Sequence, residues 1–427
     1  MPSTASHALR CLGIALLGLF LASCVGMPQR SEKVITYEMK HNFAVADPEF
    51  LRCMGELLGP GILPGNRVTA LQNGDEIFPA MLEAIRGARQ SINFETYIYW
   101  SGDIGRQFSE AFCDRAQSGV KVHVLLDWLG SNKIDRTYLA KMKACGVEVE
   151  QYHPINWYNL TRLNNRTHRK LLIVDGKIGF TGGVGIADPW TGNANDKDHW
   201  RDSHYKIEGP AVAQMQSIFG DNWLKTHARL LLGDAYYPLI PRAGPMLAQV
   251  FKSARDEGSE SVRLMYLLSI ASAAKNIRLQ AAYFVPDDLA IETLIDARKR
   301  GVNVEIIVPG PNTDSEIVQA ASRSRWTELL DAGVAIYQFQ PCLYHCKVLI
   351  VDDLWVSVGS TNFDNRSFRL NDEANLNVYD EPFAAKQIAS FEADKRASRM
   401  MTRADFKSRS APEKAFEAVA GLVRQQL

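Results

Sequence analysis

The sequence carries no net charge, because 48 Lys and Arg residues balance 48 Asp and Glu residues over a length of 427. A neutral chain has no overall basic field to recruit nucleic acid or an anionic membrane, so anion binding must come from local clusters. Cysteine is scarce, with seven residues, and no spacing typical of a metal site is present. We therefore expect no metal, no cofactor and no nucleic-acid partner.

A clear membrane-spanning run is also missing near the N-terminus. The apolar run over residues 11–22 has the length of a signal peptide and is too short to cross a bilayer comfortably. It ends in Leu21-Ala22-Ser23-Cys24, which resembles a bacterial lipobox, in which the cysteine is lipidated and begins the mature chain. We expect a signal peptide at 1–23, a tether at 24–67, and a lipidated Cys24 that anchors the protein. Val25 favours the periplasmic face of the outer membrane, whereas an ordinary signal peptide or an uncleaved anchor is the alternative.

The five cysteines outside the N-terminal segment could form disulfides if the protein is exported. Export would place them in an oxidising space, where disulfides persist. Their number is odd, so at least one is unpaired, and the sequence does not determine the pairing. Cys342 and Cys346 are one candidate pair; the five residues are Cys53, Cys113, Cys145, Cys342 and Cys346.

One motif occurs twice. His168-Arg169-Lys170, an apolar stretch and Asp175 return as His345-Cys346-Lys347, a second apolar stretch and Asp352, so both copies read H-x-K-x4-D. Each is followed by a turn of small residues, at 182–185 and 359–362. A repeat at this separation predicts two related domains. We place them at residues 68–235 and 236–427.

The order of predicted elements is also repeated. Strands and helices alternate in each half, as in βαβ units, which predicts an α/β fold with a largely parallel sheet covered by helices. Residues 412–427 predict an amphipathic helix that packs on the second domain, with membrane contact as the less favoured alternative. The predicted strands are 91–99, 120–126, 147–149, 277–284, 302–308 and 334–337, and the predicted helices are 77–88, 106–118, 137–145 and 289–300.

The motif brings polar groups together at one end of a hairpin. In an extended segment His168 and Lys170 point to the same side. Asp175-Gly176 is a favourable hairpin turn, so the returning strand ends beside the His/Lys pair, and Asp352-Asp353 is a less typical turn in the second copy. Backbone N–H groups of the small-residue turns could then hold phosphate oxygens. The turn residues predicted to bind substrate are Gly182, Gly183, Gly359 and Ser360.

Further residues around the motifs carry a family resemblance. The second copy continues as Gly-Ser-Thr-Asn-Phe-Asp-Asn-Arg-Ser over 359–367, and Trp-Arg-Asp at 200–202 precedes Ile-Glu-Gly-Pro-Ala-Val at 207–212. From about Gly74 to the C-terminus the chain resembles the phospholipase D superfamily, and within it the bacterial cardiolipin synthases. The resemblance implies two pseudo-symmetric α/β/α domains with one active site at their interface.

The resemblance also implies roles. One histidine attacks phosphorus and forms a phosphohistidine, while the other protonates the leaving alcohol and deprotonates the incoming one. His168 is assigned as nucleophile and His345 as acid/base, although the sequence leaves the reverse open. The other implied roles are neutralisation of phosphate charge by Lys170 and Lys347, a hydrogen bond from Asn362, and orientation of the two histidines, respectively, by Asp202 and Glu373. Asp175 and Asp352 belong to the catalytic motif, but their place beyond the hairpin favours a structural role. Gly185 stands where the family usually has Asn.

The expected reaction is phosphatidyl transfer. A phosphatidyl-histidine would be captured by the glycerol hydroxyl of phosphatidylglycerol to give cardiolipin, with phosphatidylglycerol or phosphatidylethanolamine as donor. Alternatives are a hydrolytic phospholipase D, a secreted phosphodiesterase or nuclease, and a non-catalytic lipid-binding lipoprotein. The balanced charge argues against a nuclease, and two intact motifs argue against the last. Trp157, Tyr158, Trp190 and Trp200 could rim an acyl groove or pack in the core, and Arg162, Arg166 and Arg169 could attract an anionic headgroup or keep a loop soluble.

Overall fold

The computed structural model describes residues 38–154, 165–253, 260–422 and 424. The expected signal peptide, Cys24, and the side chains of Trp157, Tyr158 and Arg162 lie outside this part of the chain. Within the described part, no helix has the length and apolar character needed to cross a membrane.

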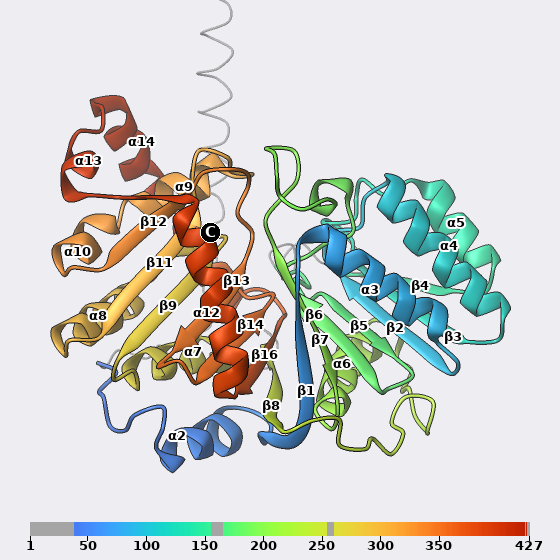
Figure 1. Cartoon of the computed structure of the whole chain (residues 1–427). Coiled ribbons are helices and arrows are strands. Elements are labelled where there is room, and N and C mark those ends of the chain that lie inside the picture. Colours follow the sequence, from blue (N-terminus) through green and yellow to red (C-terminus); the bar gives the residue numbers. More distant parts are fainter. Residues whose placement is uncertain (1–37, 155–164, 254–259, 423, 425–427) are drawn as a thin grey trace, which may run out of the picture. The chain divides into compact units, whose positions relative to one another are not determined.

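Fifteen strands form one sheet that runs through both halves (Figure 1). From one edge to the other the order is β17-β12-β11-β9-β13-β14-β16-β8-β1-β7-β6-β5-β2-β3-β4. The first half provides β1 (Leu63–Gln72), β2 (Ser91–Thr96), β3 (Lys121–Asp127), β4 (Glu148–Tyr152), β5 (Leu171–Val174), β6 (Ile178–Gly182) and β7 (Ser203–Glu208). The second provides β8 (Met246–Ser253), β9 (Asn276–Ala281), β11 (Asn303–Pro309), β12 (Ala335–Phe339), β13 (Lys347–Val351), β14 (Trp355–Gly359), β16 (Glu373–Tyr379) and β17 (Ser398–Met400). The sheet is continuous because β8 pairs with β16 on one side and with β1 on the other.

Strand direction corrects one expectation. β2, β3 and β4 are parallel, as are β9, β11 and β12. Every pairing from β9 through the centre to β2 is antiparallel. The prediction of a largely parallel sheet is therefore wrong for its centre, although the α/β fold class is correct. The reason is that a hairpin reverses strand direction, and the repeated motif itself forms the hairpins β5–β6 and β13–β14.

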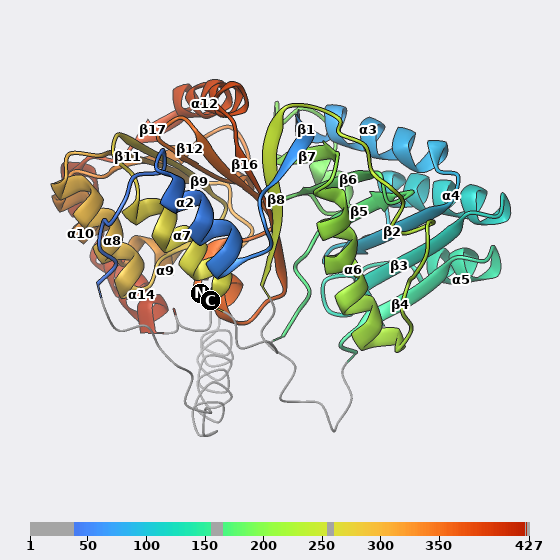
Figure 2. The ribbon, with the colours of Figure 1, turned by 90° about the horizontal axis from the view of Figure 1, so that it is seen from below.

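Helices cover both faces of the sheet. Figure 2 shows α3 (Asn73–Gly87) and α12 (Glu381–Arg396) on one face, and α6 (Val212–His227) and α7 (Ser261–Ala271) on the other. The alternation of β3 explains this burial, because Val124 belongs to the core cluster under α3 while Leu125 belongs to the cluster that contains α6. The other helices are α4 (Asp103–Gln117), α5 (Arg136–Ala144), α8 (Asp288–Lys299), α9 (Glu316–Arg323), α10 (Trp326–Asp331), α11 (Asn365–Arg369), α13 (Arg403–Lys407) and α14 (Ala411–Leu422). The predicted helices and strands are confirmed, with bounds shifted by a few residues.

The predicted tether is shorter than 24–67. Residues from 38 onward include α2 (Pro48–Arg52), the π-helical turn η1 (Cys53–Leu58) and the start of β1 at Leu63. Phe50 is fully buried, with its ring 5.0 Å from that of Trp355. The N–H of Val45 donates to the carbonyl of Ser272 at 3.1 Å. Segment 38–62 therefore packs against the second half of the chain because it carries apolar side chains that are buried there.

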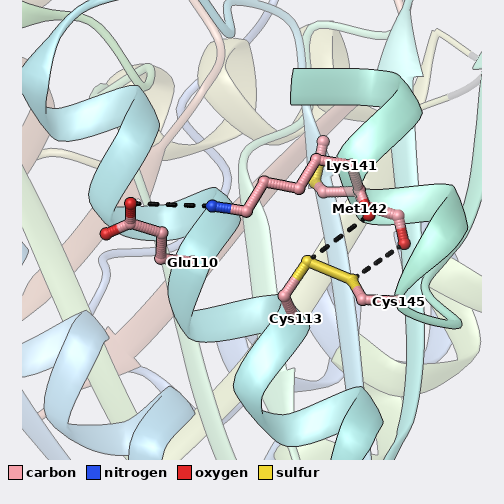
Figure 3. Close-up of a disulfide and its surroundings, with 5 residues drawn as sticks. All are labelled: Glu110, Cys113, Lys141, Met142 and Cys145. Carbon is pink, nitrogen blue, oxygen red and sulfur yellow. Dashed lines mark hydrogen bonds and ion pairs between the residues drawn. A yellow bond between two sulfur atoms is a disulfide. The ribbon is translucent and has the colours of Figure 1, made fainter. Parts of the chain in front are cut away.

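The structure also corrects the cysteine pairing. Cys113 of α4 and Cys145, which follows α5, form a disulfide (Figure 3) with Cα atoms 5.4 Å apart. Lys141 and Glu110 form an ion pair of 3.7 Å between the same two helices. The candidate pair Cys342 and Cys346 is wrong, since both thiols are buried and free. Instead, the Cys346 thiol lies in the core, 3.6 Å from the Ser203 hydroxyl.

Candidate active site

The far ends of the two motif hairpins are equivalent. Asp175 and Gly176 have φ angles of 53° and 61°, and Asp352 and Asp353 have 52° and 58°. Both turns thus use left-handed backbone at their two central positions, as a type I′ hairpin requires. The sequence Asp-Asp, although less typical than Asp-Gly, adopts the same turn. Asp tolerates this conformation better than most non-glycine residues.

The two motif aspartates are structural. The Asp175 carboxylate accepts hydrogen bonds from the backbone N–H groups that lead into β2, including that of Gln90 at 2.7 Å. Asp352 does the same at the start of β9, with the N–H of Lys275 at 2.7 Å. Each carboxylate lies at the turn of its hairpin, and the His/Lys pair lies at the opposite end. The grouping of Asp175 and Asp352 with the catalytic residues is therefore corrected.

At that opposite end, each motif histidine lies in the short segment just before the first strand of its hairpin, and this segment contacts the other half. The N–H of His168 donates to the carbonyl of Asp372 at 2.9 Å, and the N–H of His345 donates to the carbonyl of Arg201 at 2.8 Å. Single parallel bridges, Thr167 with Asp372 and Arg201 with Tyr344, accompany these bonds. The backbone thus brings the segment before each acid beside the histidine of the other half.

The side chains follow the same crossed arrangement. Nδ1 of His168 lies 2.9 Å and 3.1 Å from the two carboxylate oxygens of Glu373. Nδ1 of His345 lies 2.7 Å from Oδ2 of Asp202. The sequence order assigned Asp202 to His168 and Glu373 to His345, and that pairing is wrong. Neither half holds both its motif histidine and the carboxylate bonded to it, so the site is assembled only where the halves meet.

Each acid is fixed by further hydrogen bonds. The hydroxyls of Ser360 and Ser367 donate to the two oxygens of Glu373 at 2.5 Å and 2.7 Å. The indole N–H of Trp190 donates to Asp202 at 2.9 Å. Sequence reasoning did not assign Ser367 and Trp190 to these positions. Ser367 lay within the 359–367 stretch that carried the resemblance, whereas nothing in the sequence pointed Trp190 at a carboxylate.

The small-residue turns serve a different purpose from the predicted one. The N–H of Gly183 donates to the carbonyl of Ser203 at 3.1 Å, and the N–H of Ser360 donates to that of Ala374 at 3.0 Å, so neither is left for phosphate. A Cβ at position 183 would lie 2.2 Å from Oδ1 of Asp202. The glycine therefore leaves room for the acid. Gly182 and Gly359 are equally crowded, since a Cβ there would lie 2.6 Å from His204 and 2.3 Å from the carbonyl of Ala374.

The two halves differ at the position of the family asparagine. A Cβ at Gly185 would lie 2.9 Å from Cβ of Ile98, so the first half has little room for a longer side chain. In the second half Asn362 is buried, and its Oδ1 has no hydrogen-bond partner among the described residues. The site therefore contains one carboxamide, that of Asn362 in the second half, whose oxygen accepts no hydrogen bond from the described residues.

Both lysines are buried beside their histidines. Nζ of Lys170 donates to the carbonyl of His168 at 2.7 Å, and Nζ of Lys347 donates to that of His345 at 2.8 Å. Burial lowers the pKa of Lys170 to about 7, against the opposing effect of Glu373. Burial also lowers the pKa of Lys347. An anionic phosphate between these ammonium groups would favour their charged forms.

The histidines act on one another. Burial lowers the pKa of His168 well below its ordinary value, and Lys170, Lys347 and His345 lower it further. Two of these cations come from the second half, so both motifs share one electrostatic site. Burial and Lys347 lower the pKa of His345, while Asp202 raises it.

The two acids differ in charge. Burial raises the pKa of Glu373 to about 7, although Lys170 and the Ser360 hydrogen bond oppose the shift. Burial also raises the pKa of Asp202, but His345 and Lys347 outweigh it, so the net pKa lies below the ordinary value. Asp202 is consequently a carboxylate at neutral pH, whereas Glu373 is partly protonated.

The structure decides between the readings that the sequence left open for Trp190, and it places Arg166 and Arg169 away from the surface. Arg169 is fully buried, and its guanidinium donates to the carbonyls of Ile218 and Ser253 at 3.0 Å and 3.2 Å, so it ties α6 to β8. Arg166 is also buried, so neither arginine offers charge at the surface. Trp190 is buried against His345, with ring centroids 5.3 Å apart, and packs in the core rather than at a groove rim. Trp200 is partly buried beside it.

Comparison with known proteins agrees with this geometry. Residues 81–223 and 266–395 match the family described as "Cardiolipin synthase, PLD-like domain". The chain belongs to this family. Cardiolipin synthase 1 of Bacillus cereus is 36% identical over 363 residues, which cover 83% of this chain and 71% of the relative. Cardiolipin synthase A of Pseudomonas fluorescens is 34% identical over 348 residues, 81% of this chain and 71% of the relative.

A solved structure shows the same fold. Phosphatidylserine synthase of Haemophilus influenzae Rd KW20 superimposes with a TM-score of 0.68 at 14% identity, over 88% of this chain and 100% of that chain. The two phospholipase D-type domains of the family are thus present here, with the crossed His–carboxylate pairs at their interface.

Proposed function

We propose that this protein transfers a phosphatidyl group from one phospholipid to the glycerol headgroup of phosphatidylglycerol and so forms cardiolipin. The observation that carries this proposal is the pair of histidines, each bonded through Nδ1 to a buried carboxylate of the other half. Membership of the cardiolipin synthase family supports the same reaction over the alternatives. The protein is an enzyme, a phosphatidyltransferase of the phospholipase D type.

In the first step His168 acts as the nucleophile. Its Nδ1 faces Glu373, which leaves Nε2 to attack phosphorus. The low pKa of His168 keeps the imidazole neutral, and a neutral imidazole has the lone pair that attack requires. A P–N bond forms, the P–O bond to the donor headgroup breaks, and His345 gives its proton to the leaving alcohol. The product is phosphatidyl-His168 with free glycerol or ethanolamine.

In the second step the roles of proton donor and acceptor reverse. His345, now neutral, takes the proton from the glycerol hydroxyl of phosphatidylglycerol. That oxygen forms a P–O bond, the P–N bond breaks, and cardiolipin leaves with His168 restored. The same sequence with water as acceptor would release phosphatidate, so transfer and hydrolysis differ only in which hydroxyl reaches His345.

The charges of the acids favour this assignment of the histidines. An ionised Asp202, bonded at 2.7 Å, stabilises the cationic form of His345 that protonation of the leaving group needs. Glu373 has a pKa of about 7 and therefore stabilises a cation beside it less. His168 is accordingly the better nucleophile and His345 the better acid.

Three further groups would hold the phosphate. Lys170 and Lys347 lie beside the two histidines and would neutralise the equatorial oxygens. The side-chain NH2 group of Asn362, which is buried in the second half, would donate a further hydrogen bond to a phosphate oxygen. Because Gly185 offers no side chain in the first half, this contribution is one-sided.

The test is incubation of the purified chain with vesicles of phosphatidylglycerol. The expected products are cardiolipin and glycerol, and His168→Ala should abolish both. Release of phosphatidate without cardiolipin would refute transfer in favour of hydrolysis. Cleavage of DNA with lipids untouched would refute lipid chemistry altogether. Arg366→Lys is not a suitable control because Arg366 influences the pKa of His168. Arg86→Lys, in the last turn of α3, alters a basic side chain outside the site and serves as the control.

We also propose that the chain is an exported lipoprotein held on the periplasmic side of the outer membrane by Cys24. The Cys113–Cys145 disulfide supports export, since such bonds persist in oxidising compartments. The Cys24→Ser chain should be recovered in the soluble fraction after cell lysis. Retention of this variant in the membrane would point to an uncleaved N-terminal anchor.

A further inference from the structure

Helix α14 exposes its large apolar side chains to solvent, the reverse of what is usual for a helix on the surface of a globular domain. Phe416, Val419 and Leu422 face outward, with 49%, 63% and 83% of their surface exposed. Glu417 and Ala420 face inward and are almost fully buried. A surface helix ordinarily places its apolar stripe against the core and its charged residues in water. We call the three outward residues the α14 stripe.

The inward face explains why the helix stays in place without the stripe. Glu417 forms an ion pair with Arg409, so its charge is compensated. Ala420 packs in a small core cluster with Ala320 and Ala321 of α9. Small residues allow the two helices to approach closely. The expectation that the C-terminal segment packs on the second domain is thus confirmed for α14, but this packing leaves the stripe uncovered in the described chain.

The stripe lies at the end of the strands where the motif His/Lys pairs are found, which we call the catalytic edge of the sheet. The last residue of β9, Ala281, pairs with Lys347 of the second motif, and β11 runs parallel to β9. The chain leaves β11 at this same edge and enters α9 a few residues later, and α14 packs on α9. Figure 1 shows α9, α13 and α14 together at one end of β11 and β12.

Two contacts connect this region with the site. The hydroxyl of Tyr283, just beyond β9, donates to Asp314 in the loop before α9 at 2.7 Å. The N–H of Phe363, which follows Asn362, donates to the carbonyl of Tyr283 at 3.1 Å. Tyr283 also lines a small pocket between α9 and the sheet, whose other lining residues are largely apolar and include Phe284, Val308 and Val318. Ile317 of α9 adds a further exposed apolar side chain, at 42%.

We propose that the α14 stripe, with Ile317, inserts into the interfacial region of a phospholipid bilayer and holds the catalytic edge against it. This inference rests on the proposed function, because the substrates named there are bilayer lipids. An apolar helix face at this end of the strands would hold bilayer phosphodiester groups on the side of the molecule where the histidines lie. A second copy of the chain seated on this face would instead stand beside the catalytic edge and obstruct the approach of lipid.

The test compares two triple variants of the full chain, both in a Cys24→Ser background that removes any acyl anchor. The stripe variant is Phe416→Ser/Val419→Ser/Leu422→Ser. The matched control is Leu230→Ser/Leu232→Ser/Leu239→Ser, which removes three exposed leucines between α6 and β8. That segment lies at the opposite end of the strands from the His/Lys pairs. Its Tyr236 carbonyl packs against Gly176, in the turn of the first hairpin, where an added Cβ would lie 2.4 Å from the carbonyl oxygen.

Binding is measured by flotation with vesicles of phosphatidylglycerol and phosphatidylethanolamine. We expect the stripe variant to bind at least about tenfold more weakly, because each large apolar side chain removed from water contributes substantially to transfer. Its cardiolipin formation on vesicles should fall in parallel, while activity on short-chain phosphatidylglycerol dispersed as monomers should be retained. The control should match the parent in all three measurements. In the parent, hydrogen exchange of residues 411–422 should slow when vesicles are added.

The outcomes separate the two proposals. Unchanged vesicle binding by the stripe variant, or unchanged exchange of residues 411–422 in the parent, would overturn the docking proposal. A loss of self-association by the stripe variant with intact vesicle binding would overturn it in favour of a second copy. If no variant forms cardiolipin while flotation still distinguishes the stripe from the control, the proposed reaction is wrong and the docking surface stands.

Discussion

The crossed pairing of histidines and acids leads to a prediction that separates the two chemical steps. Asp202→Asn keeps the shape of the side chain but removes the carboxylate beside His345. Glu373→Gln does the same beside His168. If each acid serves the histidine of the other half, Asp202→Asn should impair protonation of the leaving group, and Glu373→Gln should impair the nucleophile.

The magnitude follows from the bond that is lost. Nδ1 of His345 lies 2.7 Å from Asp202, and both groups are buried. A hydrogen bond to a charged group contributes about 1.5–3 kcal/mol. Because about 1.4 kcal/mol corresponds to tenfold in rate, the first step should slow by roughly ten- to a hundredfold with a natural lipid donor. Asp202 raises the pKa of His345, so its removal should also move the alkaline limb of the pH profile, where His345 loses its proton, to lower pH.

The assay compares a natural donor with a phosphatidyl ester of p-nitrophenol, whose leaving group needs no proton. The burst of p-nitrophenol reports the first step alone. We expect Asp202→Asn to recover near parental burst rates with this ester, and Glu373→Gln to stay slow. If Glu373→Gln were rescued and Asp202→Asn were not, the histidine roles would be reversed. If the ester rescued neither, the division of labour between the histidines would be refuted.

Three other predictions follow from the same structure. Asp352→Ala removes the acceptor of three backbone N–H groups at the start of β9 and should lower the free energy of unfolding by about 1–3 kcal/mol, while kcat of the folded enzyme is retained; a large loss of kcat would restore Asp352 to the catalytic set. Gly183→Ala places a Cβ 2.2 Å from Asp202 and should reduce cardiolipin formation, whereas Gly87→Ala, where a Cβ meets nothing within 4 Å, should not; equal activities would show that Asp202 tolerates displacement. Burial raises the pKa of Glu373 from 4.5 to about 7, so the folded state holds a proton that the unfolded state releases, and this stabilising contribution is complete below pH 4.5 and lost as the pH rises through 7. In urea unfolding, the free energy of unfolding of Glu373→Gln should therefore increase relative to that of the parent as the pH rises from 4.5 to about 7. A difference in free energy that does not change with pH would contradict the pKa shift.

Local sequence patterns predicted the elements around the site well. The apolar run 171–174, the turn at Asp175-Gly176 and the strand after it do form a hairpin with its His/Lys pair at the far end. The spacing of strands and helices likewise predicted the outer βαβ units. These features depend on backbone preferences and on alternation within a few residues, which are properties of the local sequence.

Features that depend on contacts between distant segments were predicted less well. Arg169 reads in sequence as a charged neighbour of the motif, yet it is buried because carbonyls of α6 and β8 surround its guanidinium. Cys113 and Cys145 are 32 residues apart and pair because α4 and α5 are neighbours. The two halves share one sheet because β8 pairs with both β1 and β16, and no local sequence pattern predicts these pairings.

By itself, the sequence determined which groups the enzyme has: two imidazoles and two ammonium groups, repeated at the start of two hairpins, and one acid downstream of each hairpin. Only the tertiary structure decided how they combine. Glu373 reaches His168, and Asp202 reaches His345, because each histidine segment lies beside the acid-bearing segment of the other half. Local preferences act over a few residues, whereas this exchange of partners depends on how the two halves dock, and docking is decided by the packing of the whole sheet.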